Sequence, residues 1–133
     1  MSQPYTKTVL EHFLNPRNIG EMENPDATGT VRNPACGDEM TVYLRIGTRE
    51  DGEEYVEDVK IHTYGCVAAI ATSSMASELV KGKTLSEAIE ISGKVIKEAL
   101  GGLPAQKAHC SMLADEALKK AIEEYLAAKE PAA

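Results

Sequence analysis

Residues 41–64, with the sequence TVYLRIGTREDGEEYVEDVKIHTY, decide the fold of this protein. In both halves of this stretch the apolar side chains fall at every second position, a spacing that predicts strands with one buried face. The residues on that face are Val42, Leu44, Ile46, Val59 and Ile61. Between the halves lies Asp51-Gly52, a dipeptide typical of a tight hairpin turn. We expect two antiparallel strands here, with a shorter third strand near residues 28–32 beside them.

Helical patterns flank the predicted sheet. Pro4 opens a pattern with an apolar stripe, and Asn15-Pro16 stops it. After the sheet, an Ala- and Ser-rich run over residues 67–81 ends at Gly82. Three more helices are expected: one opened by the capping box Thr84-x-x-Glu87, one at residues 95–100, and one with an apolar stripe at residues 118–126.

Strands followed by helices indicate an α+β fold, in which helices cover one face of an antiparallel sheet. We therefore predict a small three-stranded antiparallel sheet with helices packed on it, an N-terminal helix and a C-terminal helical region. The chain has 133 residues, close to the length of one ordinary domain. Residues 1–133 are accordingly expected to form a single domain.

The charge balance narrows the classes of partner. The chain has 14 basic and 21 acidic residues, a net charge of −7, and only one Phe and no Trp. This composition disfavours binding to nucleic acid, which needs cationic or stacking side chains, and binding to an anionic membrane surface. No apolar stretch approaches the ~18 residues of a membrane span, and the N-terminus lacks the apolar region of a signal peptide. The expected compartment is the cytoplasm.

The three cysteines lie at junctions between predicted elements. Cys36 lies in the turn NPACGD before a strand, Cys66 lies between a strand and the Ala-rich helix, and Cys110 follows His109 just before the last helix. Positive partial charge at a helix N-terminus favours the thiolate, the form that binds metal or attacks sulfur. The odd count and the separations of 30 and 44 residues argue against a disulfide framework.

The residues alone leave two interpretations of these cysteines: small buried apolar side chains, or a shared metal or thiol site. The sequence has no CxxC pair, so a zinc ribbon or ferredoxin framework is unsupported. Adjacent His109 and Cys110 cannot easily adopt the geometry of a papain-like pair. Taken singly, Asp38 is an ordinary turn residue, His12 a residue at the edge of the core, and His62 a solvated residue on the polar strand face.

Five segments together carry a more specific signal. They are YTKTVLEHFLNPRNIG (residues 5–20), NPACGDEM (33–40), TYGCVAAIATSSM (63–75), VKGKTLSEA (80–88) and LPAQKAHCSMLADEA (103–117). In this order they resemble the U-type iron–sulfur cluster assembly scaffolds, which comprise the IscU family and the N-terminal domain of NifU. The resemblance covers nearly the whole chain.

The resemblance implies a scaffold rather than an enzyme. A 2Fe-2S cluster would be built on it from iron and from the sulfur of a cysteine desulfurase, and then passed to apo iron–sulfur proteins. A ferredoxin or another electron donor and a second copy of the chain are further implied partners. By position, Cys36, Cys66 and Cys110 correspond to the thiolate ligands, and Asp38 and His109 to the fourth ligand or a gate.

The resemblance also implies roles around Cys110. Because Cys110 precedes a predicted helix, beside His109 and near Lys107, its thiolate should be favoured. We therefore expect Cys110 to be the sulfur acceptor, in a surface loop that a desulfurase's mobile cysteine can approach. Lys107 lies near this site in the family, and an N-terminal tyrosine such as Tyr5 is associated with self-association and with reduction of the persulfide. These two residues are accessory candidates.

Two alternatives use the same side chains. One is a zinc-bound sulfur-acceptor partner of a desulfurase, and the other is a structural zinc domain, because zinc and iron both accept thiolate, imidazole and carboxylate. Zinc can also occupy the cluster-free scaffold. The scaffold is favoured because the chain lacks the inserted segment of the SufU branch and has His109 before its last cysteine. Many relatives have Leu-Pro-Pro-Val-Lys where this chain has Ala105 and Gln106, so we predict independence from the chaperone that reads that segment.

Overall fold

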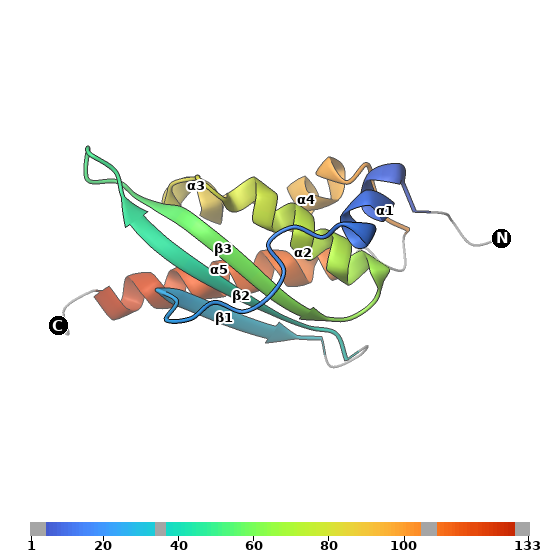
Figure 1. Cartoon of the computed structure of the whole chain (residues 1–133), viewed down its shortest axis with the longest axis horizontal. Coiled ribbons are helices and arrows are strands. Elements are labelled where there is room, and N and C mark those ends of the chain that lie inside the picture. Colours follow the sequence, from blue (N-terminus) through green and yellow to red (C-terminus); the bar gives the residue numbers. More distant parts are fainter. Residues whose placement is uncertain (1–4, 34–36, 105–108, 130–133) are drawn as a thin grey trace.

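The computed structural model describes residues 5–33, 37–104 and 109–129, with the side chains of His109 and Lys129 excepted. The elements are α1 (Lys7–Leu14), β1 (Ala27–Arg32), β2 (Glu39–Thr48), β3 (Glu54–Tyr64), α2 (Val67–Val80), α3 (Leu85–Ile89), α4 (Gly93–Ala99) and α5 (His109–Lys129). The strands form one antiparallel sheet in the order β1-β2-β3 (Figure 1). The predicted α+β fold is confirmed.

The hairpin between β2 and β3 forms at the predicted turn. Gly52 has a φ of +91°, a left-handed conformation that favours glycine, and the Asp51 carboxylate accepts the Glu53 N–H at 2.9 Å. The pairing runs from Thr48 opposite Glu54 to Glu39 opposite Tyr64, with one irregularity in register along β2. β2 begins at Glu39 and β3 ends at the opposite residue, Tyr64. The segment before β2 and the segment after β3 are therefore brought together.

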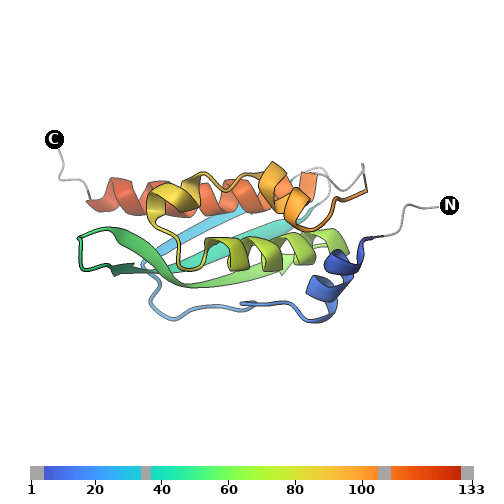
Figure 2. The ribbon, with the colours of Figure 1, turned by 90° about the horizontal axis from the view of Figure 1, so that it is seen from above.

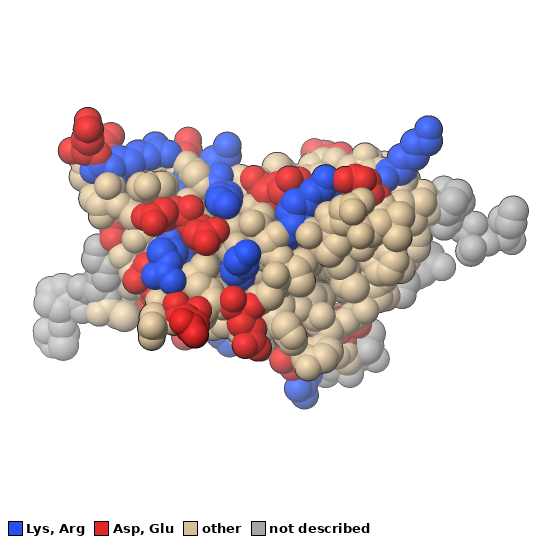
Figure 3. Space-filling view, in the orientation of Figure 1, with Lys and Arg blue, Asp and Glu red and all other residues tan. Residues whose placement is uncertain are grey.

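The helices cover one face of the sheet (Figure 2). The alternating residues Met40, Val42, Leu44, Val59 and Ile61 are buried on that face. α5 approaches β1 so closely that a Cβ added to Gly29 would lie 2.5 Å from the Ala117 carbonyl oxygen. The other face is polar, with Arg32 paired to Glu39, and Figure 3 shows both signs of charge interspersed on this side of the molecule.

α2 is the central helix, and its small side chains explain how it can be covered on several sides. Ten of its fourteen residues are buried, and these include hydroxyls that bond within the fold. Ser73 and Ser77, for example, donate to the carbonyl oxygens of Ile70 and Ser74 at 2.8 and 2.7 Å. Both α1 and α5 pack against this helix.

The start of the first helix differs from the sequence prediction. α1 begins at Lys7, not at Pro4, because the Thr6 hydroxyl accepts the Val9 N–H at 3.1 Å and caps the helix there. The predicted stop at Asn15 and the capping box of Thr84 and Glu87 are confirmed. Within the described part of the chain, every helix is too short or too polar to cross a membrane.

Candidate metal and thiol site

α2 and α5 run in the same direction and begin at the same end of the molecule (Figures 1 and 2). Cys66 is the N-cap residue of α2, directly after the turn that follows β3. Cys110 lies in the first turn of α5, because that helix begins at His109. The prediction that Cys110 lies just before the helix is wrong, because Cys110 is the second residue of α5, whereas its position near a helix N-terminus is confirmed. The positive partial charge at a helix N-terminus therefore acts near both thiols.

Asp38 completes a group of three donor side chains. Its Oδ2 lies 4.0 Å from Cys66 Sγ and 3.9 Å from Cys110 Sγ, and the two sulfur atoms are 3.8 Å apart. Both cysteines are free thiols. Ligand atoms around a tetrahedral metal with metal–sulfur bonds of about 2.3 Å are separated by roughly 3.8 Å. The sulfur–sulfur distance matches this value and the two oxygen–sulfur distances are slightly longer, so the three donors lie close to the corners of one face of a metal coordination tetrahedron.

The two thiols differ in access. Cys110 is completely buried among Ala68 and Ala69, with Tyr5 and Leu103 packed against this cluster. Cys66 is partly exposed. The expectation that Cys110 sits in an open surface loop is wrong, because residues from α2 and the N-terminal segment cover it. A reagent or donor reaches Cys110 only when these neighbours move.

The other predicted site residues stand as follows. Tyr5 lies against the thiol cluster. His109 begins α5, but its side chain is not among the described parts of the chain. Cys36 and Lys107 also lie outside the described residues, as do Ala105 and Gln106, where the sequence differs from the Leu-Pro-Pro-Val-Lys of many relatives. The structure therefore brings together Asp38, Cys66 and Cys110 from the predicted ligand set.

A second polar cluster, between α1 and α2, was missed from sequence. His12 Nδ1 lies 2.8 Å from Ser74 Oγ, and its Nε2 lies 3.4 Å from Glu78. Burial, and next the charge of Arg17, lower the pKa of His12 below 6.5. Ser74 is fully buried and its Oγ also accepts the Arg17 N–H at 2.9 Å, so this Ser–His–Glu group cannot act on a substrate as a nucleophile. The group instead stabilises the packing of α1 against α2.

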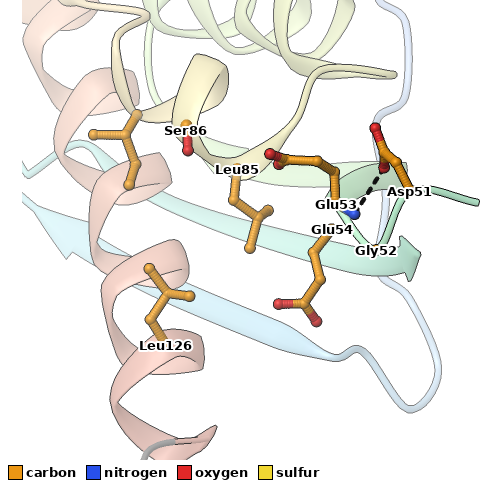
Figure 4. A pocket seen from close by; sticks show the side chains of 8 residues that line it. Asp51, Gly52, Glu53, Glu54, Leu85, Ser86 and Leu126 are labelled. Atoms are coloured by element: carbon orange, nitrogen blue, oxygen red, sulfur yellow. Dashed lines mark hydrogen bonds between the residues drawn. The ribbon is translucent and has the colours of Figure 1, made fainter. Parts of the chain in front are cut away.

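A hollow with a different lining lies at the opposite end of the molecule. This pocket of about 400 Å³ lies between the β2–β3 turn, α3 and the end of α5 (Figure 4). Its acidic residues are Asp51, Glu53 and Glu54, and its apolar ones are Leu85, Ile89 and Leu126. Its described lining includes no thiol or imidazole, so these donors differ in kind from those of the thiol site.

Comparison with known proteins decides the family. Residues 4–132 match the NifU-like N-terminal domain. The chain belongs to this family. It is 53% identical over 121 residues to the iron–sulfur cluster assembly scaffold protein IscU 1 of Archaeoglobus fulgidus, covering 91% of this chain and 76% of that protein. It is 48% identical to the IscU scaffold protein of Aquifex aeolicus, covering 95% of this chain and 78% of that protein.

Solved structures of NifU-like domains share the fold. The N-terminal NifU-like protein of Brucella abortus superposes with a TM-score of 0.66 at 24% identity, covering 94% of this chain and 95% of that one. A candidate SUF-system scaffold protein from Fervidobacterium islandicum gives 0.69 at 23% identity, covering 89% and 96%. The resemblance to the IscU and NifU scaffolds predicted from the sequence motifs is confirmed.

Proposed function

We propose that this NifU-like domain is a scaffold on which a 2Fe-2S cluster is assembled and from which it is passed on. The observation that carries the proposal is the meeting of Asp38, Cys66 and Cys110 with donor atoms 3.8–4.0 Å apart. The names of the relatives, which are iron–sulfur cluster assembly scaffold proteins, support it. The cluster is cargo and not a resident cofactor, and the domain turns over no substrate of its own.

The chemistry of the donors suits cargo that must be released. Thiolates are soft ligands that hold iron well, whereas a carboxylate oxygen is harder and holds a cluster iron less firmly. Cys36, Cys66 and Cys110 are proposed as the thiolate ligands. Asp38 is proposed as the labile fourth ligand or gate, with His109 as the residue that replaces it. Asp38→Ala is then expected to slow transfer of the cluster to an apo-ferredoxin.

Sulfur delivery follows a balanced exchange at Cys110. The Cys110 thiolate attacks the outer sulfur of a desulfurase persulfide, a new S–S bond forms on Cys110, and the desulfurase cysteine leaves as a thiolate. Because Cys110 is buried beneath Tyr5 and Leu103, this step requires those side chains to move aside. Reducing the persulfide to sulfide needs two electrons from a ferredoxin or another donor. Tyr5 and Lys107 are proposed to assist near this atom.

The zinc alternatives have less support. Two thiols and a carboxylate also bind zinc, so zinc can fill the same position in the cluster-free protein. However, the named relatives are scaffolds, and this favours cluster assembly over a zinc-bound sulfur acceptor. A purely structural zinc site is also unnecessary, since one apolar core already joins the sheet to α2, α4 and α5.

The decisive test is anaerobic assembly with a cysteine desulfurase, cysteine, a reductant and ferrous iron. We expect visible absorption of a 2Fe-2S cluster on the domain and its subsequent appearance on an apo-ferredoxin. The control omits the desulfurase. A colourless protein that retains one zinc ion under these conditions and stimulates the desulfurase would overturn the scaffold proposal in favour of the zinc-bound partner.

A further inference from the structure

Gly65 occupies the turn between β3 and α2, directly before Cys66. Six glycines among the described residues have the positive φ that side chains avoid, and Gly65 is not one of them. Its backbone conformation is therefore open to alanine. What excludes a side chain is space, because a Cβ at this position would lie 2.7 Å from Ala69 Cβ and 3.0 Å from Asp38 Cγ.

The space beside Gly65 is filled by the Asp38 carboxyl group. Asp38 Oδ1 would lie 3.1 Å from the added Cβ, while Oδ2 faces the sulfur atoms of Cys66 and Cys110. Asp38 is only 9% exposed, so its side chain has little room to move elsewhere. The carboxylate is thus held between the bare backbone of Gly65 on one side and the two thiols on the other.

From this geometry we infer that Gly65 is a positioning residue, whose missing side chain lets Asp38 reach the thiols. The inference rests on the proposed function only for its consequence, namely that Asp38 controls release of the cluster. A methyl group at position 65 pushes the carboxylate away from the donor group. Gly65→Ala should therefore reproduce the behaviour of Asp38→Ala although every ligand is still present.

The competing explanation is a general strain at the start of α2, caused by the contact with Ala69. Gly65→Ala/Ala69→Gly separates the two effects, because it removes the Ala69 methyl and leaves the contact with Asp38. Gly47→Ala is the matched control. Gly47 also lacks a positive φ, and its added Cβ would meet the side chains of Glu57 and Tyr55 at 2.6 and 2.8 Å, near the hairpin turn and away from the ends of β2 and β3 that adjoin the donor group.

The first measurement uses cobalt(II) as the probe, added anaerobically to the reduced, metal-free protein. Its absorption bands report the number of sulfur and oxygen ligands. We expect Gly65→Ala and Gly65→Ala/Ala69→Gly to give the spectrum of Asp38→Ala, and Gly47→Ala that of the wild type. Adding Asp38→Ala to Gly65→Ala should change nothing further, because both act on the same contact.

The second measurement is the rate of cluster transfer to an apo-ferredoxin. Gly65→Ala should slow transfer by about ten-fold, the size of effect typical when support around a metal site is lost, and Asp38→Ala should slow it equally. A wild-type cobalt spectrum in Gly65→Ala, or a further spectral change on adding Asp38→Ala, would overturn the inference. If the wild type binds cobalt but never assembles a cluster, the proposed function fails, and the cobalt spectra still decide the role of Gly65.

Discussion

At the end of the molecule where α2 and α5 begin, a carboxylate lies against two thiols, whereas at the opposite end the carboxylates lie against hydrogen-bond donors of the chain. Asp38 Oδ2 is 3.9 and 4.0 Å from the sulfur atoms. In the far pocket, Asp51 accepts the Glu53 N–H at 2.9 Å, and Glu54 accepts the Tyr125 hydroxyl at 2.5 Å. The same chemical group, a carboxylate, therefore stabilises a turn and a helix contact at one end and belongs to a group of metal-ligand donors at the other.

The helix starts show the same contrast. The hydroxyls of Thr6, Thr84 and Ser92 each accept a backbone N–H and cap α1, α3 and α4. Cys66 is the N-cap residue of α2, yet its side chain makes no such bond. Stability is thus optimised at ordinary helix starts and given up where the sulfur is needed for binding, a trade-off common at functional sites.

The largest expected effect is loss of the cluster when a cysteine at the thiol end of the molecule is substituted. Serine at Cys36, Cys66 or Cys110 replaces a soft thiolate with a hard hydroxyl, so none of the three variants should hold a stable cluster. Visible absorption after anaerobic assembly measures this. Glu54→Gln, at the far end, is the control and should assemble normally. A normal cluster in all three serine variants would place the site elsewhere.

Gly29→Ala tests the packing of α5 against β1, which extends between the two ends of the molecule. Its Cβ would lie 2.5 and 2.6 Å from backbone atoms of α5, which cannot turn aside as a side chain can. We expect a loss of about 3 kcal/mol in the free energy of unfolding, the upper range for overpacking. Urea denaturation measures it, with Gly47→Ala as the milder comparison. Equal losses in the two variants would show that α5 shifts freely.

Cys66→Ser should separate stability from function. The extended backbone at this position, with φ −81° and ψ −178°, suits an N-cap serine, which can accept the N–H that the thiol leaves unbound. The metal-free variant should be more stable than the wild type by about 1 kcal/mol while it loses the cluster. Thermal unfolding of both metal-free proteins is the measurement. A less stable variant would mean that the thiol itself holds the turn.

The sequence patterns predicted the sheet, its turn and the order of the helices because each depends on local alternation or on residues close in the chain. The motifs also singled out Asp38, Cys66 and Cys110. Their mutual distances could not be predicted, because they depend on where the ends of β2 and β3 meet the starts of two helices far apart in sequence.

The burial of Cys110 and the role of Gly65 needed coordinates for a related reason. Cys110 is covered by Tyr5, more than one hundred positions away in the chain, and no local pattern encodes that contact. His12 stands on an apolar stripe, which placed it at the edge of the core. Its hydrogen bond to Ser74 joins two helices, so the periodicity of either helix alone could not predict it.

His12 makes the α1–α2 contact sensitive to acid. Its folded pKa is lowered, chiefly by burial and next by Arg17, so the unfolded chain binds the proton more readily. The stability that this contributes is present above pH 6.5 and is lost as the pH falls below it. In His12→Asn, which cannot titrate, stability should change less between pH 7 and 5. Denaturation across this range measures the difference, and parallel curves would contradict it.

The smallest expected effect belongs to the far end and has the opposite pH dependence. Burial, and next the bond to Glu54, raise the pKa of Tyr125 to about 12. Because the folded protein holds this proton more tightly than the unfolded chain, the contribution is complete below pH 10 and is lost between pH 10 and about 12. Tyr125→Phe should cost about 1 kcal/mol at neutral pH, the net value of one hydrogen bond, because the partly exposed Glu54 regains water. Above pH 10 the difference between the two proteins should shrink, as read from denaturation at each pH. A constant difference up to pH 12 would show that the contribution of the hydroxyl does not depend on the proton that it donates to Glu54.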